Sequence, residues 1–122
     1  MEKRSGSMKL IVAGSRTLKI KKLIERQLNN LKSRYPELTV ISGMARGPDR
    51  LSYNWAVEHN VAVIPMPADW KQYDKVAGHI RNEEMAKIGT HLLAYWDGYS
   101  PGTKSMISLA SKYGLKTHVV YL

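Results

Sequence analysis

The sequence contains no cysteine, and this absence excludes several classes of site. Without a thiol, the chain can build neither a disulfide framework, nor a thiolate metal site, nor a cysteine nucleophile. The histidines do not compensate, because their positions show no metal-ligand spacing: His59, His79, His91 and His118. We therefore expect no bound metal and no cofactor.

Long apolar segments are missing as well. No run approaches the ~20 residues that a transmembrane helix needs, and the N-terminus lacks the apolar core of a signal peptide. We expect a cytoplasmic protein with no membrane partner. The length of 122 residues suits one domain. We interpret the polar, non-periodic residues 1–7 as a disordered lead or a remnant of cloning, and residues 8–122 as the folded domain.

Acidic residues are scarce relative to basic ones. The chain has 19 Lys and Arg against 10 Asp and Glu, a formal net charge of +9, which favours an anionic partner. Many cations lie on or before the first predicted helix: Lys3, Arg4, Lys9, Lys19, Lys21, Lys22, Arg26, Lys32 and Arg34. Such a face is either simply solvated or a track for nucleic acid. Tyr35 is the only aromatic residue of this helix, which argues against base stacking there.

Short apolar runs alternate with amphipathic segments from residue 8 onward. The runs predict strands at 9–13, 38–41, 61–64, 91–95 and 117–121. Apolar residues at helical spacing predict four helices between them, the last beginning near Gly102 or Thr103. This alternation predicts a doubly wound α/β domain, with a five-stranded parallel sheet and helices on both faces.

One predicted connection, at 65–74, is long for so small a domain. Connections of this length are often functional lids, and this one contains Asp69 and Trp70. The indole of Trp70 either stacks on a bound base or serves as a hydrophobic plug.

Three glycine-containing turns follow the first, second and fourth predicted strands. Ligands of doubly wound sheets bind outside the carboxyl ends of the strands, where the strand order reverses. The usual strand orders place the first strand beside the second and the fourth, so the three turns surround one crevice. Backbone N–H groups at the helix N-termini there favour a phosphate. The candidate binding residues in these turns are Gly14, Ser15, Arg16, Gly43, Ala45, Arg46, Gly47, Asp49, Asp97, Gly98, Ser100, Gly102 and Thr103.

Two aspartates in these turns each have two interpretations. Asp49 either binds a ligand hydroxyl or complements the dipole of the helix that it begins. Asp97 either contacts a ribose or makes a local Asx turn. Arg16 and Arg46 are the candidate cations for the phosphate.

The segment Gly98-x-Ser100-x-Gly102 matches the pattern of a serine-hydrolase nucleophile elbow. In that elbow, the backbone N–H after the serine forms part of the oxyanion hole. Here the next residue is Pro101, which has no N–H, so we do not expect a serine hydrolase.

Five motifs together resemble a known family. In order, they are Gly14-Ser15-Arg16, Gly43-x-Ala45-Arg46-Gly47-x-Asp49 with Trp55-Ala56, Pro67-Ala68-Asp69-Trp70, Gly78-x-Ile80-Arg81-Asn82-x-x-Met85, and Trp96-Asp97-Gly98-x-Ser100-x-Gly102-Thr103. With these motifs the chain resembles the YspA (cpYpsA-related) branch of the SLOG superfamily. The resemblance implies a Rossmann-like domain that binds nucleotides, nucleotide-derived signals or nucleic acid, commonly as an oligomer. It also adds Arg81 and Asn82 to the candidate site.

The same superfamily contains the LONELY GUY phosphoribohydrolases, which pair an arginine with the glutamate of a Gly-Thr-x-x-Glu pattern. The carboxylate assists as the glycosidic bond opens through a cationic sugar. Arg81 matches the arginine, but Met106 stands where the glutamate would be. If the chain were such an enzyme, the missing carboxylate would have to come from another position, such as Asp49, Asp69, Glu83 or Asp97.

The resemblance therefore favours a binding protein over an enzyme. We expect a sensor or sequestering protein for a nucleotide or an ADP-ribose-like or cyclic nucleotide, acting in nucleotide signalling as a homodimer or higher homo-oligomer. One alternative is a phosphoribohydrolase acting on nucleoside monophosphates, with Arg81 and Asp97 as candidate catalytic residues. A second alternative is a nucleic-acid-binding module similar to DprA, another SLOG protein, which binds single-stranded DNA.

Overall fold

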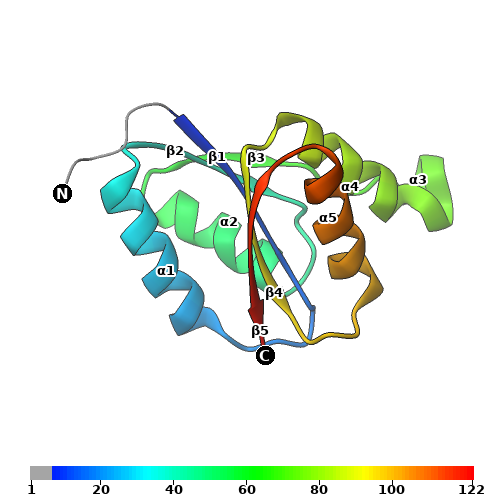
Figure 1. The fold of residues 1–122 in the computed structure, drawn as a ribbon, viewed down its shortest axis with the longest axis horizontal. Coiled ribbons are helices and arrows are strands. Elements are labelled where there is room, and N and C mark those ends of the chain that lie inside the picture. The colour runs from blue at the N-terminus through cyan, green and yellow to red at the C-terminus, as the bar shows by residue number, and fades with distance from the viewer. Residues whose placement is uncertain (1–6) are drawn as a thin grey trace.

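The computed structural model describes residues 7–122 and contains one parallel sheet between two layers of helices (Figure 1). The strands are β1 (Ser7–Gly14), β2 (Glu37–Ser42), β3 (Ala62–Pro65), β4 (His91–Trp96) and β5 (Lys116–Tyr121). The helices are α1 (Lys21–Arg34), α2 (Pro48–Glu58), α3 (Trp70–Tyr73), the 3-10 turn η1 (Asp74–Val76), α4 (Ala77–Ile88) and α5 (Pro101–Lys112). The strand order is β3-β2-β1-β4-β5 with every pair parallel, which confirms the predicted doubly wound fold.

The apolar core has two parts, one on each face of the sheet. On one face, Ile24 and Leu28 of α1 and Trp55 of α2 are buried against the strands. On the other face, Met85 of α4 and Met106 of α5 are buried in the same way. The central strands β1 and β4 contribute side chains to both parts, which explains why their sequences are continuous apolar runs rather than alternating ones.

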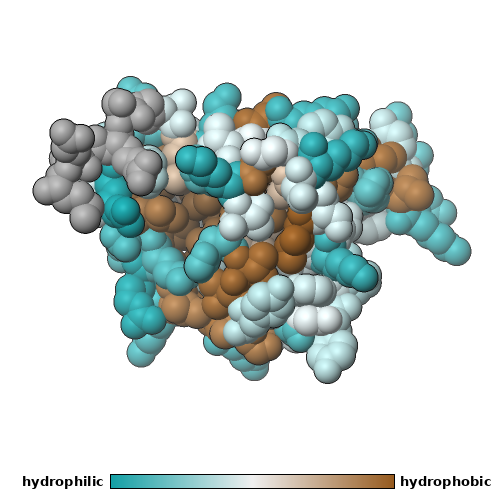
Figure 2. Space-filling model, viewed as in Figure 1, coloured by the Kyte–Doolittle hydropathy of each residue, from teal (hydrophilic) through white to brown (hydrophobic). Residues whose placement is uncertain are grey.

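The two edge strands are less covered than the prediction of helices on both faces implies. All residues of β3 and β5 are exposed or half-buried, although α2 contacts β3 and α5 contacts β5, because each edge strand has a neighbouring strand on one side only. A shallow groove of about 290 Å³ lies between α1 and the pair β4–β5, with Gln27, Leu31 and His118 among its lining residues. Figure 2 shows hydrophobic side chains gathered between α1 and β5 on this face.

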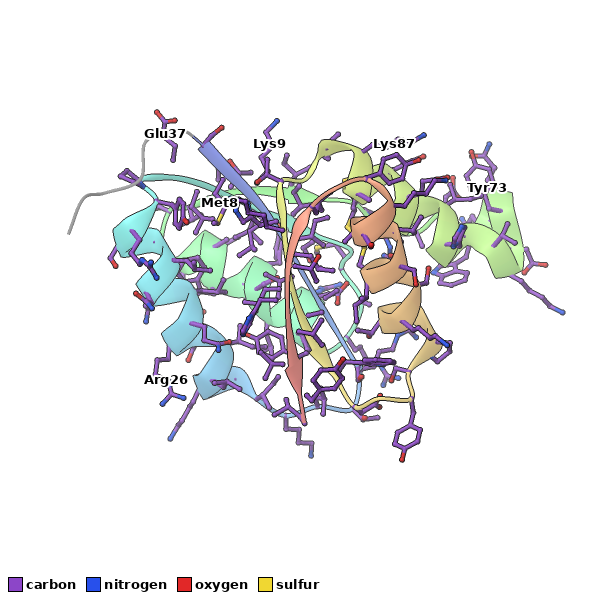
Figure 3. All side chains as sticks on the ribbon, in the orientation of Figure 1. Met8, Lys9, Arg26, Glu37, Tyr73 and Lys87 are labelled. Atoms are coloured by element: carbon purple, nitrogen blue, oxygen red, sulfur yellow. The ribbon has the colours of Figure 1, made fainter. Side chains whose placement is uncertain are left out.

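The first strand begins at Ser7, two residues earlier than predicted. Met8 is buried while Lys9 extends outward, the alternation of an extended chain (Figure 3). On α1, the exposed Arg26 points to solvent, so the basic side of this helix lies opposite its buried one (Figure 3). We interpreted residues 1–7 as a disordered lead or a cloning remnant; of these, Ser7 belongs to β1, and residues 1–6 lie outside the described part.

The connection at 65–74 is not the irregular loop that we predicted, because α3 and η1 occupy its second half. Asp69 is the N-cap of α3, and its carboxylate accepts a hydrogen bond from the backbone N–H of Gln72 at 3.1 Å. Figure 1 shows α3 projecting beyond α4 at one end of the molecule. Within residues 7–122, no helix has the length and apolar character needed to cross a membrane.

Candidate functional site

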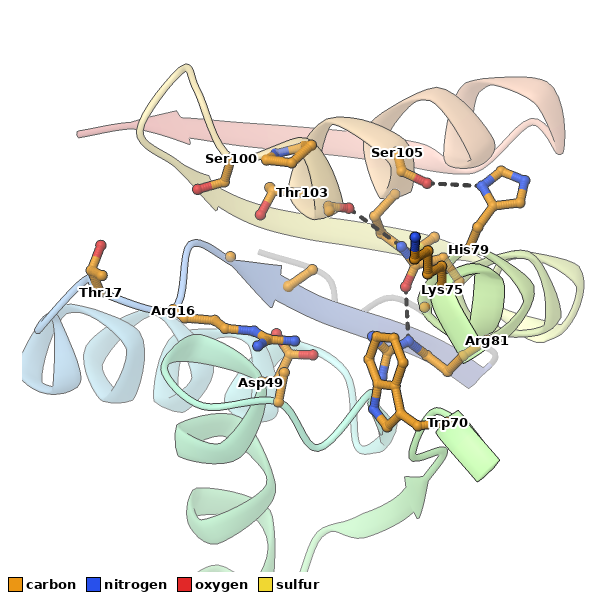
Figure 4. Close-up of a pocket in the computed structure, with 18 residues that line it drawn as sticks. Arg16, Thr17, Asp49, Trp70, Lys75, His79, Arg81, Ser100, Thr103 and Ser105 are labelled. Atoms are coloured by element: carbon orange, nitrogen blue, oxygen red, sulfur yellow. Dashed lines mark hydrogen bonds between the residues drawn. The ribbon is translucent and has the colours of Figure 1, made fainter. Parts of the chain in front are cut away.

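A pocket of about 620 Å³ opens at the carboxyl ends of β1 and β4, where the strand order reverses (Figure 4). We call it the switch-point pocket. Four segments line it: the end of β1 and the loop after it, the start of α2, the stretch from α3 to α4, and the start of α5. The lining residues are Ala13, Gly14, Arg16, Thr17, Ala45, Asp49, Trp70, Lys75, Gly78, His79, Arg81, Asn82, Ser100, Pro101, Gly102, Thr103, Ser105 and Met106.

Asp49 is a buried carboxylate at the base of this pocket, with 5% of its surface exposed. Burial raises its pKa to about 6, although the charge of Arg81 and hydrogen bonds from backbone N–H groups, those of Gly14 and Ala45 among them, act in the opposite direction. These contacts join the end of β1 to the start of α2. Asp49 therefore lies close to residues of two of the three predicted turns.

Arg81 reaches the same place from α4. Its Nη1 donates a hydrogen bond to the carbonyl oxygen of Gly43, and its Nε donates one to Oδ1 of Asn82 at 2.9 Å. Asn82 in turn donates from Nδ2 to the carbonyl oxygen of Gly102 at 3.3 Å. Arg81 and Asn82 thus connect α4 both to the end of β2 and to the first turn of α5.

The side chain of Arg16 extends toward Asp49 from the loop after β1 (Figure 4). Burial lowers the pKa of Arg81, the charge of Asp49 raises it, and the nearby charge of Arg16 lowers it again. The last effect shows that the two guanidinium groups are close enough to repel each other. An anion between them would relieve this repulsion.

The N-terminus of α5 forms the opposite wall. Pro101 occupies the first helical position, and the first intrahelical hydrogen bond runs from the N–H of Lys104 to the carbonyl oxygen of Ser100 at 3.1 Å. The N–H groups of Gly102 and Thr103 precede that bond, so no carbonyl within the helix accepts from them. Such a helix start attracts anions.

The segment from α3 to α4 supplies lining residues that our sequence interpretation missed: Lys75, Gly78 and His79. Nδ1 of His79 lies 3.2 Å from the hydroxyl oxygen of Ser105 on α5. The signal was available, because positions 75, 78, 79 and 82 recur at intervals of three and four residues, as on one helix face. Thr17, Ser105 and Met106 were also missed as binding residues.

With this geometry established, three comparisons place the chain among known proteins. A model of the YspA, cpYpsA-related SLOG family matches residues 8–73. The chain belongs to this family. It is also 33% identical over 114 residues to the Gene 61 protein of Mycobacterium phage D29, a match that covers 88% of this chain and 91% of that protein.

Two solved structures have the same fold as this YspA-family chain. DNA processing protein A (DprA) of Streptococcus pneumoniae matches with a TM-score of 0.77 and 17% identity, over 92% of this chain and 50% of that one. DprA of Helicobacter pylori, described with its single-stranded DNA binding mode, matches with a TM-score of 0.66 and 18% identity, over 92% of this chain and 64% of that one. The chain thus spans half to two thirds of these proteins.

Several residues of the family motifs lie outside the lining of the switch-point pocket. Asp97 is one: its carboxylate accepts hydrogen bonds from the N–H groups of Tyr99 and Ser100, both at 2.8 Å, and from the hydroxyl of Ser100 at 2.9 Å. These bonds lower its pKa to about 2. The Asx turn is therefore the interpretation of Asp97 that the structure supports. Gly98, in the same turn, is exposed.

Arg46 faces a different hollow, which has a volume of about 780 Å³ and which we call the cation groove. Ala45 and Asp49 line the pocket, whereas Arg46 and Arg50, each one position further along the chain, line the groove. The residues of the cation groove are Arg16, Leu18, Lys19, Ile20, Lys21, Lys22, Leu23, Arg46, Gly47, Arg50 and Leu51.

Three of the remaining candidates, Ser15, Gly43 and Asp69, form hydrogen bonds within the protein. Ser15 is buried, and its N–H donates to the carbonyl oxygen of Tyr95 at 3.0 Å. Gly43 accepts the hydrogen bond from Arg81, and Asp69 caps α3. Trp70 lines the pocket with 53% of its surface exposed, so it is not a buried plug. Among residues 7–122, no three His, Asp or Glu side chains gather where they could hold a metal ion.

Proposed function

We propose that this YspA-family chain binds a phosphorylated nucleotide in the switch-point pocket and releases it unchanged. The observation that carries this proposal is that Arg16 and Arg81 line the same pocket, with the N-terminus of α5 as the opposite wall. The pocket lining has three permanent cations, with Lys75 the third, and a single carboxylate, that of Asp49. Such a site attracts an anion, and phosphate is the group that helix N-termini and arginines bind best.

The other lining residues suit the rest of a nucleotide. The exposed indole of Trp70 supplies a face on which a base stacks. The hydroxyls of Ser100 and Ser105 and the ring of His79 offer hydrogen-bonding partners for ribose. An ADP-ribose-like or cyclic nucleotide has these same groups, and binding without turnover suits a sensor or a sequestering protein. A cytoplasmic location remains a prediction.

The phosphoribohydrolase alternative has less support. Met106, which is 1% exposed, stands in the pocket wall at the position of the glutamate in the enzymes' pattern. Asp97 is engaged in its own turn, and the carboxylate of Asp49 is held by backbone N–H groups. The pocket therefore offers no freely accessible carboxylate among its lining residues to assist glycosidic cleavage.

Two further expectations stay proposals. Binding of nucleic acid is the second candidate function, and the net charge of +9 together with the fold shared with DprA supports it. Its signature would be oligonucleotide affinity that falls steeply with added salt. A homodimer or higher homo-oligomer is supported by the exposed edge strand β5, which ends at Tyr121, 69% exposed, and is followed by Leu122, 51% exposed. Light scattering during size-exclusion chromatography tests this second expectation.

The first experiment is retention of ligands from a mixed pool. The protein is incubated with nucleoside monophosphates, ADP-ribose, cyclic ADP-ribose isomers and cyclic dinucleotides, separated, and denatured, and released molecules are identified by mass spectrometry. We expect an intact nucleotide in the protein fraction and no free base in the flow-through. Free base would instead indicate an enzyme.

A matched pair of variants locates the site. Arg16→Ala should release the retained nucleotide, and Arg34→Ala, an exposed arginine at the end of α1, should retain it. Both positions are exposed, so folding is preserved in each variant. Equal retention by the two variants would show that the ligand binds elsewhere.

A further inference from the structure

The cation groove and the switch-point pocket share one residue, Arg16. They lie on either side of the contact between the loop after β1 and the segment that leads into α2. At this contact, an added Cβ on Gly47 would lie 3.1 Å from both the Cα and the carbonyl oxygen of Arg16. The side chain of Arg16 therefore stands at the junction of the two hollows.

The groove is more strongly charged than the pocket. Six of its lining residues are cations and none is acidic. Within the part of the chain that the structure describes, none of these cations forms an ion pair with a carboxylate; the pair found there joins Lys112 to Glu83. The groove thus concentrates positive charge that the protein itself leaves uncompensated.

Three of these cations stand where local helix energetics disfavour them. Lys21 and Lys22 are the first two residues of α1, Lys19 precedes them, and the first turn of this helix has no acidic residue. The N-terminus of a helix carries partial positive charge, so lysines there repel it. An anionic ligand in the groove would compensate both the lysines and the helix terminus.

The two hollows exceed what one nucleotide fills. Ligand pockets for small molecules occupy roughly 300–1,000 Å³, a range that already includes the switch-point pocket with its 620 Å³. The groove adds about 780 Å³ beyond Arg16. Its lining has apolar residues such as Leu18 and Leu51 but no aromatic ring, so it favours phosphates over stacked bases.

We propose that the natural ligand contains at least two nucleotide units joined through phosphate. The first unit occupies the switch-point pocket, the chain passes Arg16, and the phosphate of the next unit lies in the cation groove among Lys19, Lys22 and Arg50. This inference rests on the proposed nucleotide site and extends it. The shared chemistry fits either a dinucleotide or the end of a single strand.

The test is calorimetric titration with 5′-phosphorylated oligonucleotides of one, two, four and eight units, made from each base in turn. We expect two units to bind at least about tenfold more tightly than one, because the second phosphate binds intramolecularly. The slope of log affinity against log salt should steepen by about 0.7 for each added phosphate contact.

A triple variant of the groove, K19A/K22A/R50A, should lose the increase in affinity that the second nucleotide unit provides. Its control, R34A/K71A/K87A, removes the same number of exposed cations from outside both hollows and should keep the gain. If the affinity stops increasing at two units, the ligand is a dinucleotide. If it continues to increase up to eight units, the ligand is a single strand. Both results support the extended ligand.

Two results would overturn the extended ligand: equal affinity for one and two units, or equal losses in the groove variant and its control. The proposed nucleotide pocket would survive either result as long as a single nucleotide binds the wild-type protein. If a single nucleotide does not bind and is not retained from the mixed pool, the pocket proposal itself fails. The two failures are therefore distinguishable.

Discussion

The side-chain amide of Asn82 on α4 donates a hydrogen bond to the carbonyl oxygen of Gly102, in the first turn of α5, at 3.3 Å. The other end of the same amide accepts from Arg81. One buried side chain thus positions a guanidinium group and a helix N-terminus relative to each other. The anion site that we propose in the switch-point pocket depends on this relationship between two helices that pack on the same face of the sheet.

Replacing Asn82 by alanine should destabilise the fold and weaken nucleotide binding together. The substitution leaves the Nε of Arg81 and the carbonyl oxygen of Gly102 without their partner, and an unsatisfied buried group costs about 1–3 kcal/mol. Urea denaturation measures the loss in the free energy of unfolding. Asn54→Ala, at an exposed position of α2, is the control and should change little. Equal stability of the two variants would contradict the positioning role of Asn82.

The buried carboxyl of Asp49 should make stability depend on pH in an unusual direction. Its pKa is raised from 3.8 to about 6, so between these values the folded state binds more protons than the unfolded state. The free energy of unfolding therefore decreases as pH rises from about 4 to 6, and above that range Asp49 causes no further change with pH. The total decrease is on the order of 3 kcal/mol.

Asp49→Asn provides the comparison, because an amide does not titrate in this range. Chemical denaturation at several pH values should show the wild-type free energy of unfolding falling relative to that of the variant between pH 4 and 6. Parallel pH profiles for the two proteins would mean that Asp49 does not titrate as we describe. Asp97 should not contribute to this pH dependence, because its pKa is lowered to about 2 and it stays ionised between pH 4 and 6.

Gly47→Ala should destabilise the protein by about 1–3 kcal/mol, since Gly47 has φ 86° and ψ −139°, a region that only glycine populates readily. The added Cβ would also press on the backbone of Arg16 at 3.1 Å. Gly114→Ala is the matched control, because Gly114 also has positive φ, 74°, but open space around it. Thermal unfolding should show the larger loss for Gly47→Ala, and a reversed order would contradict the close contact with Arg16.

Trp70→Ala should weaken nucleotide binding without unfolding the protein. Base stacking on an aromatic side chain contributes about 1–3 kcal/mol, equivalent to roughly 5- to 150-fold in affinity. Because Trp70 is 53% exposed, its removal leaves no large cavity. Trp70→Phe should retain most of the affinity, and Tyr99→Ala, 88% exposed outside the pocket lining, should retain all of it. Undiminished binding by Trp70→Ala would remove the stacking role.

The sequence by itself determined the architecture and the edge of the sheet where the candidate site lies. Apolar runs of strand length alternating with helical spacing allow essentially one arrangement, a parallel sheet with right-handed crossovers. Parallel strands all end at the same edge, so the turns after β1, β2 and β4 had to meet there. The same argument predicted that the start of α5 lies at this edge, and the family motifs added Arg81 and Asn82 to the candidate site.

Only the tertiary structure decided which of these residues face the pocket. Sequence spacing cannot show that Asp97 satisfies its carboxylate within its own turn, or that Arg46 points into the cation groove while Asp49 points into the pocket. The helix α3 was equally hidden, because a helix of four residues has no periodicity to detect. These choices depend on local hydrogen bonds and on how the loops contact one another, and those contacts exist only after the chain has folded.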